Sequence, residues 1–112
     1  KIDNMGEEFK EKIIYDGVKY VQSNYSDDIS LCEAAEAANL SIHYFSRLFK
    51  KEMGCTFKEY ITRLRMEEAK RKLNRTDTNI CSIAKEVGYT EPSYFSKVFK
   101  KYEGVSPSEY RN

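Results

Sequence analysis

Two stretches of the chain carry polar and basic side chains at helical spacing. The intervals of three, four and seven residues place each set on one face of a helix. The first set is His43, Ser46, Arg47 and Lys50, and the second is Ser93, Ser96, Lys97 and Lys100. On a helix in the major groove of DNA, Arg and Lys can donate to guanine N7 and O6, and short polar groups can reach other base edges. The two faces therefore predict DNA recognition, with a solvated helix face as the alternative for any single residue.

Lysines at the end of each stretch are suited to a different contact. Lys50 and Lys51, like Lys100 and Lys101, come one turn after the proposed base-reading positions. There they can bind phosphates, which adds affinity without sequence information.

Cysteine and histidine usage argues against other site chemistry. Cys32, Cys55 and Cys81 form no CxxC pair, and His43 is the single histidine. Neither a disulfide framework nor a zinc site is indicated, so we expect reduced, mostly buried thiols and no cofactor. Cys55 has no nearby His or second Cys to activate it, and His43 has no partner for a catalytic dyad, so we expect no enzyme activity.

Apolar periodicity predicts helices throughout, and hence an all-α fold. Ser30, Ser41 and Thr56 are suited to cap helices, and Gly54 and Gly104 to end them. The expected ranges are 7–24, 31–38, 42–53, 57–73, 80–87 and 91–102, followed by a last turn from Ser106 with Pro107 at its first position. Within 42–53 the expected core residues are Ile42, Phe45, Leu48, Phe49 and Met53.

An internal repeat organises these elements. SRLFKKEMGCTFKEY, residues 46–60, aligns with SKVFKKYEGVSPSEY, residues 96–110, at an offset of 50. Upstream of these segments the offset is 49: Leu31, Cys32, Ala35 and Leu40 align with Ile80, Cys81, Ala84 and Tyr89. The second copy therefore holds one extra residue, near Glu91 and Pro92. Two copies are too few for a solenoid, so a duplicated supersecondary unit is predicted.

Each copy reads as a short helix, a tight turn and a longer helix. Ala35 and Ala84 would let the two helices approach closely. Four residues later, Asn39 and Gly88 occupy positions where the turn needs a positive φ. We therefore predict two helix-turn-helix subdomains, at 7–55 and 77–112, joined by a linker helix at 56–76 and preceded by a linker remnant at 1–6.

Charge distribution agrees with this assignment better than net charge does. The net charge is only +1, yet residues 43–51 and 92–101 contain no acidic side chain. No apolar run approaches the roughly 20 residues that span a bilayer, and residues 1–12 lack a signal-peptide pattern. We expect a cytoplasmic protein without membrane contact.

The sequence also resembles a known family over nearly its whole length. IAKEVGYTEPSYFSKVFKKYEGVSPSEYR, residues 83–111, is similar to the signature of the C-terminal DNA-binding domain of AraC/XylS transcriptional regulators. Residues 40–73, LSIHYFSRLFKKEMGCTFKEYITRLRMEEAKRKL, resemble the first recognition helix and linker helix of that family. The resemblance implies a seven-helix, homeodomain-like tandem helix-turn-helix fold whose recognition helices enter neighbouring major grooves.

The resemblance also assigns contacts with DNA. It implies base contacts from His43, Ser46 and Arg47 in the first subdomain and from Pro92, Ser93, Ser96 and Lys97 in the second. Because Pro92 and the small serines offer few base contacts, the second subdomain is expected to act chiefly through the backbone or shape of DNA. The expected backbone contacts are Ser30, Ser41, Lys50, Lys51, Thr90, Lys100 and Lys101.

Two other functions stay open at this point. One is a helical protein-interaction module; the other is an accessory domain for alkyl-transfer DNA repair, because a few relatives join this fold to that chemistry. Residues 23–54 resemble the output domains of response regulators, so we expect a receiver or effector-binding domain N-terminal to this chain and contact with RNA polymerase.

Overall fold

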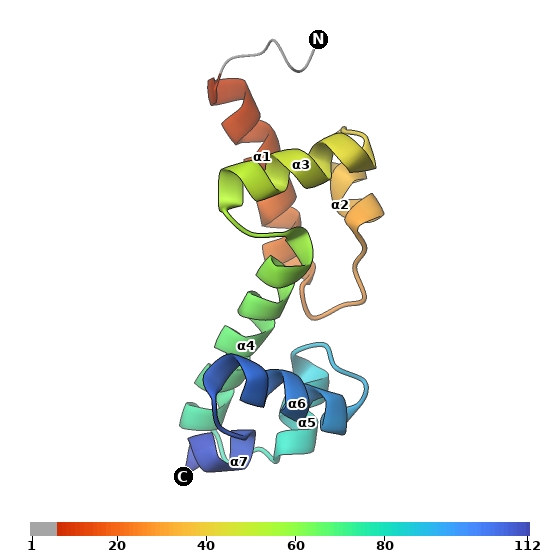
Figure 1. Cartoon of the computed structure of the whole chain (residues 1–112). Coiled ribbons are helices and arrows are strands. Elements are labelled where there is room, and N and C mark those ends of the chain that lie inside the picture. Colours follow the sequence, from red (N-terminus) through yellow and green to blue (C-terminus); the bar gives the residue numbers. More distant parts are fainter. Residues whose placement is uncertain (1–6) are drawn as a thin grey trace. The chain divides into compact units, whose positions relative to one another are not determined.

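The computed structural model describes residues 7–112, with side chains from Lys12 onward, and within them it contains seven helices and no strand (Figure 1). The expected all-α, seven-helix architecture is confirmed. The helices are α1 Glu7–Asn24, α2 Leu31–Ala37, α3 Ile42–Met53, α4 Phe57–Arg75, α5 Ile80–Glu86, α6 Pro92–Glu103 and α7 Pro107–Arg111. The expected linker remnant at 1–6 lies outside the described residues.

The chain forms two compact units. The first contains α1, residues 28–56 with α2 and α3, and the beginning of α4 as far as Ile61. The second contains Thr62–Asn112 together with the short segment Tyr25–Asp27. Helix α4 is therefore divided between the two units, and we describe each unit by itself.

Aromatic side chains dominate the core of the first unit. Phe45 and Phe49 are fully buried, with ring centroids 5.7 Å apart, and Phe57 lies edge-on to both. Gly17 of α1 lies against Phe45, so close that an added Cβ would be 2.6 Å from the Phe45 ring. The missing side chain at Gly17 thus lets α1 pack directly on α3.

The core of the second unit is built from α4, α5 and α6. Met66, Ala69 and Leu73 of α4 are spaced by three and four residues, so they share one buried face. They form one cluster with buried residues of the other elements: Ile83, Ala84, Val87, Tyr89, Phe95 and Phe99.

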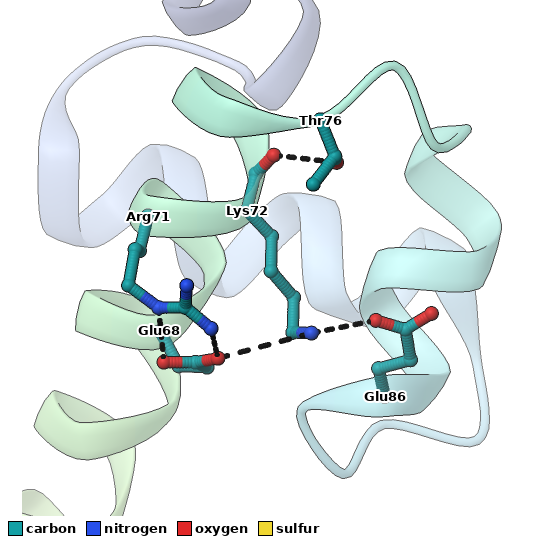
Figure 2. Close-up of polar contacts among 5 residues, drawn as sticks. All are labelled: Glu68, Arg71, Lys72, Thr76 and Glu86. Atoms are coloured by element: carbon teal, nitrogen blue, oxygen red, sulfur yellow. Dashed lines mark hydrogen bonds and ion pairs between the residues drawn. The ribbon is translucent and has the colours of Figure 1, made fainter.

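Polar contacts join α4 to α5 and α7 within this unit. Lys72 lies 2.8 Å from a carboxylate oxygen of Glu86 on α5 and 3.8 Å from Glu68, which also pairs with Arg71 (Figure 2). At the end of α4, the Arg111 side chain donates hydrogen bonds to the backbone carbonyls of Leu73 and Thr76. These carbonyls lie at a helix end, where they lack partners inside the helix.

Three expectations about burial were wrong. Ile42 is 42% exposed, because it begins α3 about 10 Å along the helix axis from Phe49, beyond the end of the core. Cys32 and Cys81 are exposed rather than buried, and only Cys55 is in the core. The two residues buried next on each helix, Ala34 and Ala35 or Ile83 and Ala84, are centred about 110° around the helix from the cysteine, so each cysteine lies beside the buried face and not within it.

Candidate nucleic-acid interface

The polar face of α3 is open to solvent. The three predicted base-reading residues of this helix, His43, Ser46 and Arg47, are all exposed, and so are Lys50 and Lys51. The opposite face holds the buried Phe45, Leu48 and Phe49. The core therefore fixes which side of α3 faces outward, and that side is polar and basic.

A tight turn and a side-chain cap fix the start of α3. Asn39 has a φ of 59°, and the backbone N–H of Leu40 donates to the carbonyl of Ala35 at 2.9 Å. Ser41 then caps α3, because its hydroxyl accepts a hydrogen bond from the N–H of Tyr44 at 3.2 Å. The buried Ala35, with 1% exposure, leaves room for the close approach of α2 and α3.

The turn of the second unit repeats this arrangement 49 residues later. Gly88 has a φ of 109°, and the N–H of Tyr89 donates to the carbonyl of Ala84 at 2.9 Å. The expected positive φ at Asn39 and Gly88 is thus confirmed, and Ala35 and Ala84 are both buried. The predicted pair of helix-turn-helix motifs is present in the structure.

The extra residue of the second copy changes how its longer helix begins. Glu91 is the N-cap of α6 but its side chain makes no capping hydrogen bond, and Pro92 occupies the first turn. Proline suits that position because it has no N–H to satisfy. The helix-turn-helix of the second unit therefore lacks the cap that Ser41 supplies in the first.

The predicted contact residues of α6 divide by exposure. Ser93, Lys97, Lys100 and Lys101 are exposed, as is Thr90 in the preceding turn, whereas Pro92 and Ser96 are half-buried. The lysines at the ends of α3 and α6 lie where the helix dipole is negative and favours cations. Both α3 and α6 thus end in an exposed basic turn.

Two predicted contact residues have local partners. The guanidinium of Arg47 lies over the ring of Tyr44, 5.9 Å from the ring centroid, one turn earlier on α3. Ser30 forms a capping box: its hydroxyl accepts from the N–H of Glu33 at 3.1 Å, while the Glu33 carboxylate accepts from the Ser30 N–H at 3.0 Å. A role of Ser30 in phosphate binding stays a prediction.

Sequence reasoning missed one polar residue beside the second turn. The Arg65 side chain of α4 donates to the backbone carbonyls of Tyr25 and Asp27 at 2.7 and 3.0 Å, and its guanidinium lies 5.1 Å from the centroid of the Tyr89 ring. Nothing in the local sequence around Arg65 distinguishes it from a solvated arginine on a helix, because its hydrogen-bond partners lie 38 and 40 residues earlier in the chain.

Among the side chains that the structure describes, from Lys12 onward, no three or more His, Cys, Asp or Glu are placed to hold a metal ion. Within residues 7–112, no helix has both the length and the apolar character that crossing a membrane requires.

Known proteins with similar sequences are helix-turn-helix transcriptional regulators. A family model described as a helix-turn-helix domain matches residues 34–112. The HTH-type transcriptional regulator YisR of Bacillus subtilis is 38% identical over 91% of this chain and 36% of its own length. The lactose operon transcription activator of Staphylococcus xylosus is 39% identical over 88% of this chain and 36% of its own length. This chain therefore spans about a third of each of these relatives.

A solved structure agrees with the fold. The C-terminal domain of AraT, a response regulator from Geobacillus stearothermophilus, superposes with a TM-score of 0.85 at 42% identity. The match covers 88% of this chain and 83% of that domain.

Proposed function

The chain belongs to the AraC-type family of helix-turn-helix DNA-binding domains, and from this we propose that it binds double-stranded DNA in sequence-specific fashion to regulate transcription. The observation that carries the proposal is the duplicated motif, in which α3 and α6 both expose a polar and basic face while the opposite face is buried. Each such helix fits the major groove, and two of them suit neighbouring groove segments on one side of the duplex.

The proposed contacts divide into two classes. Arg47 is the strongest base reader, because its guanidinium is exposed and can donate two parallel hydrogen bonds to one guanine. The other proposed base contacts are His43, Ser46, Pro92, Ser93, Ser96 and Lys97. The proposed backbone contacts are Ser30, Ser41, Lys50, Lys51, Thr90, Lys100 and Lys101.

Selection of bound duplexes from a randomised DNA pool tests this function. At about 0.1 to 0.15 M salt we expect enrichment of two short motifs about ten base pairs apart, one helical turn of DNA. A single motif would restrict base reading to one unit and leave the other as a backbone clamp. Absence of any enriched sequence would contradict specific binding by this chain.

The larger protein context is a further proposal. The two curated relatives described above are about three times as long as the stretch they share with this chain, which supports a regulator with an additional receiver or effector-binding domain. We propose that this regulator works in the bacterial cytoplasm, contacts RNA polymerase and acts by binding rather than by catalysis. In vitro transcription from a promoter carrying the selected sequence, with purified polymerase, tests the contact.

A further inference from the structure

Arg65 has an unusual set of partners within the second unit. Its side chain is half-buried, and its Nε and terminal nitrogen donate hydrogen bonds to the carbonyls of Tyr25 and Asp27. The same guanidinium lies over the ring of Tyr89. Arg65 thus contacts both the segment Tyr25–Asp27 and Tyr89, the residue that follows Gly88.

Gly88 makes room for this arrangement. A Cβ at Gly88 would lie 3.0 Å from the Cζ and Nε of Arg65 and 3.0 Å from the carbonyl oxygen of Ser26. Gly54 and Gly104 also have positive φ, but a Cβ there would meet nothing within 4 Å. The lack of a side chain at Gly88 therefore serves the approach of Arg65 as well as the backbone of the turn.

Tyr89 connects Arg65 to the first turn of α6. Its ring centroid lies 5.6 Å from that of Phe95 and 5.9 Å from that of Tyr94. Burial raises the pKa of the Tyr89 hydroxyl, and this effect outweighs the opposing influence of the Arg65 guanidinium and a hydrogen bond with Thr62. Contacts therefore run continuously from Arg65 through Tyr89 to the beginning of α6.

The beginning of α6 needs such support because it has no side-chain cap. Ser41, Asn79 and Ser106 each accept a backbone N–H at the start of α3, α5 and α7, whereas Glu91 makes no such bond at α6. An N-terminal cap stabilises a helix by accepting one of the backbone N–H groups that have no partner inside the helix. The cation–π contact of Arg65 with the buried Tyr89 ring is a stabilising interaction of comparable strength.

We propose that Arg65 is a positioning residue for the second recognition helix, holding Tyr89 against the first turn of α6 and so fixing Pro92 and Ser93 relative to the DNA. The proposal rests on the proposed function, since it concerns how the second unit meets DNA. It identifies a residue of α4 that acts on recognition without touching the duplex.

Amide hydrogen exchange tests the structural half of the proposal without DNA. The first turn of α6 is monitored at the Phe95 N–H, which donates to the Glu91 carbonyl at 3.1 Å. The end of α5 is monitored at the Val87 N–H, which donates to the Ile83 carbonyl at 3.0 Å. In Arg65→Leu we expect about fivefold faster exchange at Phe95, the fold-change equivalent to a cation–π contact of about 1 kcal/mol, with little change at Val87.

Two further variants sharpen this measurement. Arg65→Lys keeps the charge but lacks the fork that reaches two carbonyls, so we expect partial rescue at Phe95. Arg71→Leu removes a positive charge from the same helix, but the side chain of Arg71 donates to Glu68 and not to the Tyr25–Asp27 segment. This control should leave the exchange rate of the Phe95 N–H unchanged. Unchanged exchange at Phe95 in Arg65→Leu, or equal acceleration at Phe95 and Val87, would overturn the positioning role.

Hydroxyl-radical footprinting on the selected duplex tests the functional half. We expect Arg65→Leu to lose protection over the half-element bound by the second unit and to keep it over the first. Equal protection by Arg65→Leu and the unchanged chain would refute the effect on recognition. If the unchanged chain protects neither half-element, the proposed function itself fails, and the exchange result still decides the role of Arg65 in the fold.

Discussion

Salt dependence gives the most direct test of the proposed interface. Each phosphate neutralised by Lys or Arg releases counterions, so the binding constant falls with salt at a log-log slope of about −0.9 per contact. The exposed basic side chains of α3 and α6 supply the contacts: Arg47, Lys50, Lys51, Lys97, Lys100 and Lys101. If all six lie near phosphates, the slope is about −5.4 and affinity falls about 10³-fold between about 50 and 200 mM salt.

Charge-removing variants localise this effect. Lys100→Ala combined with Lys101→Ala removes two of the contacts, so the slope should shrink by about 1.8, to about −3.6. Lys12→Ala removes another exposed charge, on α1 and outside the proposed interface, and should leave the slope unchanged. Fluorescence anisotropy titrations with a labelled duplex across a salt series measure all three slopes.

Two results would refute this reasoning. A slope near zero would show that the contact is largely apolar, as expected for a protein-interaction module rather than a DNA-binding domain. Equal slopes for the double lysine variant and the unchanged chain would place the DNA elsewhere on the molecule.

Further predictions concern base reading, the second turn and pH. Arg47→Ala should cost about 1 to 3 kcal/mol on the best duplex and relax preference at one base pair in competition binding, whereas equal losses on all sequences would contradict a base contact. Gly88→Ala should lower the free energy of unfolding in urea by about 2 to 4 kcal/mol, because the strain of a positive φ adds to the close contacts of the new Cβ with Arg65. Gly104→Ala has the same kind of φ strain but no neighbour within 4 Å, so it should cost about 1 to 2 kcal/mol. Equal costs for the two variants would show that the contacts with Arg65 do not require a glycine at position 88. The hydrogen bond from Arg71 lowers the pKa of Glu68 below its ordinary value of 4.5. The resulting stabilisation is present above that value and is lost as pH falls through the folded-state pKa, so unfolding at pH 7 and pH 3 should differ less in Glu68→Gln than in the unchanged chain.

Helix limits could be predicted because local chemistry sets them. Ser30, Ser41 and Ser106 cap the helices that they were expected to cap, and the Thr56 hydroxyl accepts the N–H of Glu59 at 3.1 Å. The repeat likewise predicted both turns, since a positive φ leaves a signature of Asn or Gly in the sequence. Capping and turn preferences involve residues only three to five positions apart.

Tertiary contacts were less accessible to sequence reasoning. Periodicity places Tyr60, Ile61, Leu64, Ala69 and Leu73 on the apolar side of α4 and leaves Met66 out, yet Met66 is fully buried. A period alone does not tell which neighbours will cover a side chain. Arg65 looks like a solvated residue of α4, yet its hydrogen-bond partners lie 38 and 40 residues earlier in the chain. Within the proposed interface, exposure was confirmed for most contact residues, while their contact with DNA stays a prediction.

The division of α4 between the two units has a practical consequence for dissecting the protein. A fragment that stops at the Gly54 turn would lack Phe57 and Tyr60, both buried in the first unit. A fragment that begins at Thr62 would keep most of the second unit but lose Tyr25–Asp27, the segment held by Arg65. No single cut yields two intact halves, so the separate contributions of the units to DNA binding must be measured by substitution within the intact chain.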